Sequence, residues 1–181
     1  LAGTFAHLAS FSFETKKHLS AGEGGMVITN DEELGTKVRR MSGIGYKTLE
    51  ASQALRANLP EEFQSPFYKR HNTLGWNYRM NEVTAAIALA QLERIEYLVK
   101  RRQEVASYFL EAVDGCDWII PQSSPDGYEN SWWTFTVKYL GDEKYGVPWK
   151  IFWELYKKNG GDGFYGGLSL TLKEPVFIEK P

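Results

Sequence analysis

The stretch FSFETKKHLSAGEGGMVITN, residues 11–30, carries the strongest structural signal in this chain. Phe11 and Phe13 alternate with a serine, and a continuous Met-Val-Ile run lies near the end of the stretch. Alternation with a period of two and short β-branched runs are both typical of strands. We therefore expect two buried strands, over 7–13 and 26–29, joined by a polar turn and a glycine-rich corner.

Two adjacent lysines, Lys16 and Lys17, lie between the expected strands, and Gly-Glu-Gly-Gly follows them at 22–25. A lysine held between two buried strands is poorly solvated, and poor solvation makes its amine nucleophilic. This is the chemistry of a lysine that forms a Schiff base. Paired lysines in a turn are more often solvated surface charge, and the glycines can simply shape a hairpin or a bulge. Spacing alone leaves both interpretations open.

The string SFETKKHLSAGEGG, which begins at Ser12, resembles the lysine segment of the DegT/StrS family of pyridoxal-phosphate-dependent sugar aminotransferases. The pattern of that family is Ser-Phe, three variable residues, Lys, a short spacer and Glu-Gly-Gly. Counting from Ser12, or back from the glutamate, places the family's lysine on Lys17, the second of the pair. The block GWNYRMNEVTAAIALAQLERI, at 75–95, resembles the family's Gly-x-Asn-Tyr-Arg-Met segment and the helix after it. Two separated motifs in the correct order argue against chance agreement.

The resemblance implies pyridoxal 5'-phosphate as the cofactor and Lys17 as the catalytic residue. Lys17 would hold the cofactor covalently and, once released, act as a general base. Ser12 matches the family's serine that hydrogen-bonds the phosphate. Asn77 matches the asparagine that reaches the phosphate from the other subunit of a homodimer. Family members that carry histidine in place of the lysine are dehydratases, so Lys17 argues against that branch.

Other residues near the two motifs have less definite roles. The resemblance leaves Arg79 either as a substrate ligand or as the partner of a nearby acid. Tyr165, among the glycines of the segment GGDGFYGGLSLTLKEP, is a candidate for shaping a sugar pocket. Glu23 is more consistent with orienting the turn than with chemistry. We expect His7 and His18 to be structural, because a neutral imidazole does not stabilise a pyridinium as a carboxylate does.

The fold implied by the resemblance is α/β. Residues 1–80 would form the C-terminal part of the large cofactor-binding domain, a mixed sheet with helices. Residues 81–113 would form a long linking helix, and 114–181 a small α/β domain that is truncated. The family's aspartate at the pyridine nitrogen would lie upstream of Leu1. We therefore expect the chain to be an internal fragment that is inactive by itself.

Local signals predict where individual elements begin. Asn30 is a candidate N-cap for a helix over 31–41, with an acidic capping-box partner three residues later, and Asn81 is a candidate N-cap for the linking helix. Residues 46–74 show no periodicity and predict a long loop with one helical turn, either a lid or an interface segment. Further along, strand, helix-start and helix-end signals lie at 118–120, 132–140, Pro148 and Gly160.

Composition limits the classes of function. The chain has 181 residues, 43% hydrophobic and 24% charged, with a net charge of −2, so no strong field favours nucleic acid or an anionic membrane. No apolar run approaches the length of a membrane span. The one cysteine, Cys116, excludes an internal disulfide and fits a reducing, cytoplasmic setting. No ligand spacing predicts a metal site.

The sequence thus predicts a transaminase acting on a keto-sugar, commonly nucleotide-linked, with glutamate as amino donor. Its products would serve surface polysaccharide or related amino-sugar synthesis. Two alternatives remain open at this stage. One is a catalytically silent structural or interaction protein that keeps the fold. The other is a carbohydrate-binding module, motivated by the six tryptophans.

Overall fold

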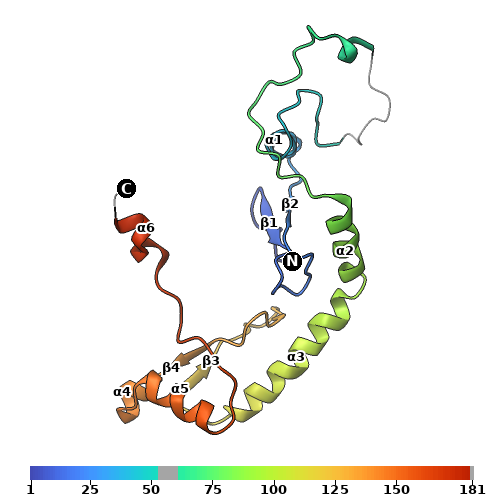
Figure 1. Cartoon of the computed structure of the whole chain (residues 1–181). Coiled ribbons are helices and arrows are strands. Elements are labelled where there is room, and N and C mark those ends of the chain that lie inside the picture. Colours follow the sequence, from blue (N-terminus) through green and yellow to red (C-terminus); the bar gives the residue numbers. More distant parts are fainter. Residues whose placement is uncertain (53–60, 180–181) are drawn as a thin grey trace. The chain divides into compact units, whose positions relative to one another are not determined.

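The computed structural model describes residues 1–52 and 61–179, and the chain forms two compact units (Figure 1). The first unit comprises Leu1–Val99 and the second begins at Lys100. Among the helices that the structure describes, none has both the length and the apolar character needed to cross a membrane. The domain boundaries predicted at residues 80 and 113 stay a prediction.

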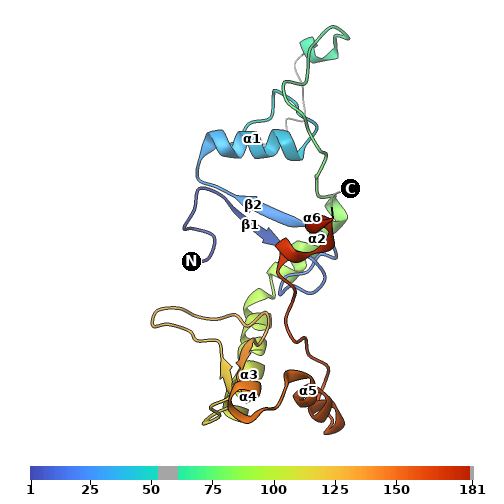
Figure 2. The same cartoon turned by 90° about the vertical axis from the view of Figure 1, so that its left-hand side faces the viewer.

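The first unit is built on an antiparallel hairpin of β1 (Ala9–Ser12) and β2 (Gly25–Ile28), in which Ser12 lies opposite Gly25. Figure 2 shows this hairpin with α1 (Glu32–Ser42) beside it. The expectation of two buried strands is wrong, because most strand residues are exposed, Met26 by 53%. The physical reason is that β1 and β2 pair only with each other among the described residues, and two strands cannot cover their own faces.

Helix α1 begins one residue later than the sequence signal indicates. The N-cap is Asp31, not Asn30, because the Asp31 carboxylate accepts the Leu34 N–H at 2.9 Å. An aspartate in extended backbone three residues before a free N–H satisfies that donor directly. The second predicted cap is confirmed: Asn81 Oδ1 accepts the Thr84 N–H at 2.8 Å.

The segment expected to be one long helix is divided in two. Helix α2 spans Glu82–Leu92 and α3 spans Ile95–Ala112. Between them the Arg94 N–H bonds the Gln91 carbonyl, three residues back, at 3.1 Å. This tighter turn interrupts the four-residue repeat of α-helical bonds.

The segment between α1 and α2 contains one helical turn, as expected. That turn is η1 (Glu61–Gln64). Residues 53–60 of the predicted loop lie outside the described residues. Tyr46 and His71 form an antiparallel bridge near the two ends of the loop, and their rings lie 4.9 Å apart.

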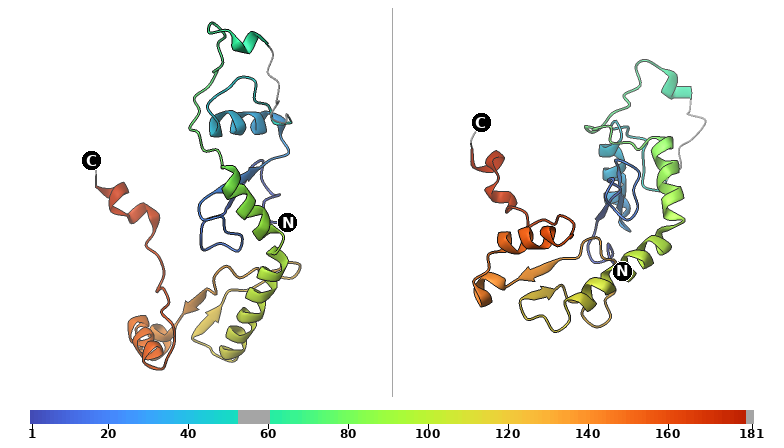
Figure 3. Two further views of the ribbon diagram at one scale, coloured as in Figure 1. Left: turned by 45° about the vertical axis from the view of Figure 1, so that its right-hand side comes forward. Right: turned by 60° about the horizontal axis from the view of Figure 1, so that its bottom comes forward.

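The second unit contains a small antiparallel pair followed by helices, shown in yellow to red in Figure 3. Its elements are β3 (Ile119–Pro121), β4 (Val137–Tyr139), α4 (Gly141–Tyr145), α5 (Trp149–Lys158), η2 (Thr171–Lys173) and α6 (Pro175–Ile178). Strand β4 is shorter than predicted, and α4 was not expected. Helix α5 begins at Trp149 with Pro148 as its N-cap, one residue later than the signal that placed Pro148 at the first helical position. Aromatic rings of Trp118, Tyr139 and Phe152 pack together, with centroids 5.4–5.8 Å apart.

Candidate functional site

The two ends of the loop between β1 and β2, residues 13–24, are joined by backbone hydrogen bonds. At its base the Phe13 N–H donates to the Gly24 carbonyl, and the Ala21 N–H donates to the Phe13 carbonyl, each at 2.9 Å. Phe13 and Ala21 are 8% and 7% exposed, which makes them two of the three buried apolar residues in the described part of the chain. The loop is therefore a compact unit with close ends and its own small core.

Lys17 has a defined place in this loop. Its backbone N–H donates to the Glu14 carbonyl at 2.9 Å, and the Glu14 carboxylate accepts the Lys16 N–H at 3.1 Å. Glu14 thus holds the turn at both lysines. The Lys17 residue is half-buried whereas Lys16 is exposed. This difference in exposure favours Lys17, rather than Lys16, as the lysine of a binding site.

Ser12 ends β1 immediately before the loop. Its hydroxyl oxygen accepts the Glu14 N–H at 3.3 Å. A serine hydroxyl carries one proton and two acceptor positions, so accepting this bond leaves the proton available for another group. The side chain is exposed and suited to donate to an anion.

The second motif is held by an unusually close crossing of two backbone segments. A Cβ placed on Gly45 would lie 2.0 Å from the Thr73 carbonyl oxygen, and one on Gly75 would lie 2.4 Å from the Ile44 carbonyl carbon. No side chain fits at either position. Gly45 also has a φ of +79°, in the left-handed region that favours glycine.

Two further backbone bonds fasten the motif to the end of α1. The Trp76 N–H donates to the Met41 carbonyl and the Asn77 N–H donates to the Gly43 carbonyl, both at 2.8 Å. Asn77 itself has a φ of 55°. Its side-chain oxygen accepts a hydrogen bond from Arg79 Nε at 2.7 Å. The observed partner of Arg79 is therefore an amide rather than an acid.

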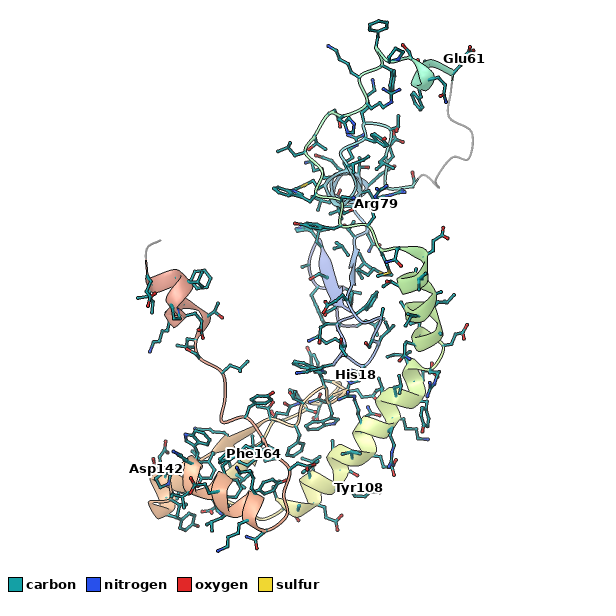
Figure 4. The ribbon with its side chains drawn as sticks, in the orientation of Figure 1. His18, Glu61, Arg79, Tyr108, Asp142 and Phe164 are labelled. Carbon is teal, nitrogen blue, oxygen red and sulfur yellow. The ribbon has the colours of Figure 1, made fainter. Side chains whose placement is uncertain are left out.

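The structure brings some of the predicted residues together and leaves others apart. Ser12, the last residue of β1, directly precedes the loop that carries Lys17. Figure 4 shows Arg79 beside α1, at one end of the hairpin, and His18 in the loop at the other end. Asn77 belongs to the same segment as Arg79, two residues away. Tyr165 belongs to the second unit, where it is 83% exposed.

Sequence reasoning missed two residues of the loop, Glu14 and Thr15. Both occupy variable positions of the family pattern, so the motif gave no reason to single them out. A general signal exists, because threonine and acidic side chains often bond nearby backbone groups in turns. Thr15 does so here: its hydroxyl donates to the Gly22 carbonyl at 3.0 Å.

The donors present suit a phosphorylated aldehyde. An amine on Lys17 can condense with a carbonyl, and the Ser12 hydroxyl and Asn77 amide are neutral donors of the kind that bind phosphate oxygens. The residues present therefore fit pyridoxal phosphate. No group of three or more His, Cys, Asp or Glu side chains placed to hold a metal occurs within 1–52 and 61–179.

Solved structures first establish the class of fold. The *Escherichia coli* GDP-4-keto-6-deoxy-D-mannose-3-dehydratase with bound hydrated PLP superposes with a TM-score of 0.72 at 24% identity, over 88% of this chain and 40% of that one. Helicobacter pylori PseC, an aminotransferase involved in the biosynthesis of pseudoaminic acid, superposes with a TM-score of 0.71 at 23% identity, over 99% of this chain and 45% of that one. The chain thus has the α/β fold of the fold-type I pyridoxal-phosphate enzymes, as expected.

Sequence comparison then gives the family. The DegT/DnrJ/EryC1/StrS aminotransferase family matches residues 1–148, and this chain belongs to that family. GDP-perosamine synthase of *Escherichia coli* O157:H7 is 28% identical over 142 residues, 78% of this chain and 34% of the relative. The spore coat polysaccharide biosynthesis protein SpsC of Bacillus subtilis (strain 168) is 30% identical over 148 residues, which are 81% of this chain and 36% of the relative.

Three statements follow from these comparisons. The chain spans about a third of the length of the curated relatives that it matches. Pyridoxal phosphate is the cofactor that membership of the family implies. The family relation concerns sugar-modifying enzymes, both aminotransferases and dehydratases.

Proposed function

We propose that the protein to which this chain belongs transfers an amino group to a keto-sugar, with Lys17 as its catalytic residue. The observation that carries the proposal is the position of Lys17. It is half-buried in a self-closed loop, at the place where the family pattern requires its lysine. The proposed sugar is nucleotide-linked and the proposed donor is glutamate. We further propose a cytoplasmic homodimer that serves polysaccharide or related amino-sugar synthesis.

Each residue has a proposed task. The Lys17 amine holds the cofactor and then moves a proton at the substrate carbon as a general base. The Ser12 hydroxyl donates to the phosphate from the end of β1, next to this loop. When bound, pyridoxal phosphate would supply an electron sink for this proton transfer. The buried pair Phe13 and Ala21 limits the movement of the loop, which keeps the amine in place.

The homodimer is proposed from the position of the second motif. Arg79, in the second motif, and His18, in the loop that carries Lys17, lie at opposite ends of the hairpin in Figure 4. A second copy would bring its Asn77 to the Lys17 loop of the first. The carboxamide is neutral, so a partner can supply it without adding charge.

The tryptophans support a carbohydrate-binding module only in part, because Trp76, Trp133 and Trp149 are exposed whereas the other three contact neighbouring side chains. The rings of Trp118 and Trp132 pack against aromatic neighbours of the second unit, and Lys157 Nζ lies 3.3 Å from the centre of the Trp153 ring. Aromatic rings engaged in this way serve packing rather than display.

The test uses the full-length protein with pyridoxal phosphate. We expect an absorbance band in the visible range that borohydride converts into a stable adduct, located on Lys17 by peptide mass spectrometry. Lys17→Ala removes the band and the adduct, and Lys16→Ala, the matched control, keeps both. Equal loss in the two variants would contradict the register.

A second measurement identifies the reaction. With glutamate and a nucleotide-linked keto-sugar, we expect an amino-sugar and 2-oxoglutarate as products, read by mass spectrometry. A deoxy-sugar that has lost water without gaining nitrogen would instead place the protein among the dehydratases. A folded, cofactor-loaded protein that yields neither product would support the silent relative.

A further inference from the structure

The backbone at Asn77 is fixed in a conformation that few side chains adopt. Its φ of 55° lies in the left-handed region, which asparagine tolerates better than most residues other than glycine. The bond from the Asn77 N–H to the Gly43 carbonyl holds it there. Because both the backbone and its anchor are fixed, the Cα–Cβ direction of Asn77 is fixed as well.

Two side-chain torsions remain, and the hydrogen bond with Arg79 determines how the amide at their end is oriented. Arg79 Nε lies 2.7 Å from Asn77 Oδ1. An arginine has no acceptor, so only the amide oxygen can face it; the opposite orientation would set two donors against each other. The Asn77 NH₂ group is therefore directed away from Arg79. Within 1–52 and 61–179 these two N–H donors have no acceptor.

We propose that Arg79 is a positioning residue, which orients the Asn77 amide so that its NH₂ group donates to the phosphate of pyridoxal phosphate. The inference rests on the proposed function and goes beyond it, since it gives Arg79 a role other than contact with the sugar. The positive charge of Arg79 also polarises the amide, because a hydrogen bond from a charged donor strengthens the partial positive charge on the opposite NH₂.

A double-mutant cycle on the full-length protein tests this inference. The variants are Asn77→Ala, Arg79→Ala and the double variant, and the readout is the dissociation constant of pyridoxal phosphate. Each single change should weaken binding about tenfold, the range for a hydrogen bond to a charged group. The double variant should bind no more weakly than Asn77→Ala alone, because Arg79 acts through Asn77. Pyridoxal, which lacks the phosphate, should show no change, and this also controls for folding.

Two substitutions sharpen the result. Asn77→Asp keeps an acceptor for Arg79 but removes the donors, so it should weaken phosphate binding at least as much as Asn77→Ala. Arg79→Lys keeps a charged donor and should recover part of the affinity. These variants also preserve the fold if the alanine changes do not.

Three outcomes would overturn the inference. Additive losses in the double variant would mean that Arg79 contacts the ligand independently. An unchanged cofactor affinity with a raised KM for the sugar in Arg79→Ala would make Arg79 a substrate ligand. Normal cofactor binding by Asn77→Asp would show that the Asn77 NH₂ group does not donate to the phosphate. The proposed function fails separately, if Lys17→Ala retains the borohydride-stable adduct.

Discussion

The Thr15 hydroxyl donates a 3.0 Å hydrogen bond to the Gly22 carbonyl oxygen, across the loop that carries Lys17. The bond joins residues seven positions apart and lies beside the two backbone bonds at the base of the loop. In this bond a side chain joins the two sides of the loop. The geometry of the Lys17 turn therefore depends on a residue at a variable position of the family pattern.

Replacing Thr15 tests that dependence. Thr15→Val keeps the shape but removes the hydroxyl, and it should destabilise the closed loop by about 1 kcal/mol, the usual net value of one hydrogen bond. Faster amide hydrogen exchange over residues 13–24 in the cofactor-free full-length protein measures the effect. Thr15→Ser keeps the hydroxyl and should exchange like the wild type. Equal exchange in Thr15→Val and wild type would show that the bond contributes nothing.

The crossing at Gly45 makes a second prediction. Gly45→Ala would set a Cβ 2.0 Å from the Thr73 carbonyl oxygen, in addition to the cost of a left-handed alanine. We expect a loss of about 3 kcal/mol or more in the free energy of unfolding, measured by urea denaturation. Gly115→Ala is the matched control: its φ is also positive, at +69°, but its Cβ would meet nothing within 4 Å. Gly115→Ala should lower the free energy of unfolding by about 1 kcal/mol, because only the left-handed backbone disfavours alanine there. Similar losses in both variants would mean that the close approach is relieved by movement.

The N-terminus of α1 allows a direct comparison of neighbouring residues. Asp31→Ala removes the acceptor of the Leu34 N–H and should cost about 1 kcal/mol of unfolding free energy. Asn30→Ala should change stability little, because Asn30 is not the cap. Thermal denaturation of the two variants under one condition measures the difference. A larger effect at Asn30 would reverse the assignment of the cap.

The Asp117 carboxylate predicts a pH dependence in the second unit. Hydrogen bonds from Lys144 Nζ at 2.8 Å and from the Tyr145 hydroxyl at 2.9 Å hold the pKa of Asp117 below its ordinary value. A carboxyl whose pKa is lowered by folding stabilises the folded state above its unfolded pKa, and that contribution is lost as pH falls through the lowered folded value.

Asp117→Asn should therefore lower the Tm at about pH 7, where every ordinary carboxyl is ionised. The difference from wild type should shrink in acid, as the wild-type carboxyl is itself protonated. Asp114→Asn removes the same charge from an exposed neighbour and serves as the control. The exposed ion pair makes the expected effect small. A difference that persists unchanged into acid would rule out the ionised carboxyl as its source.

Several features were predictable because they depend on short spacings. The register that selects Lys17 follows from counting along one motif. The Asn81 cap and the helical turn in the long loop are also local, and the structure confirms these two; the start of α5 was predicted one residue too early. The family and the α/β fold followed from two motifs in order. The functional roles of Ser12, Lys17, Asn77, Arg79 and Tyr165 remain predictions.

Features that involve partners distant along the chain, or competition between neighbours, were not predictable. Asparagine and aspartate are both favourable N-cap residues, so the sequence did not distinguish Asn30 from Asp31. The backbone conformation of the folded chain places the Asp31 carboxylate at the Leu34 N–H. Strand periodicity marked apolar residues but could not show what covers them, so the burial of β1 and β2 was predicted wrongly.

The sequence by itself determined the family, and it predicts Lys17 as the family's lysine, because that prediction depends only on counting residues between recognisable neighbours. Only the tertiary structure decided how the side chains around it are arranged. Thr15 reaches Gly22 because the loop closes, and Arg79 faces the Asn77 oxygen because the backbone at Asn77 turns into the left-handed region. Hydrogen bonds of this kind depend on distances and directions that exist only once the chain is folded.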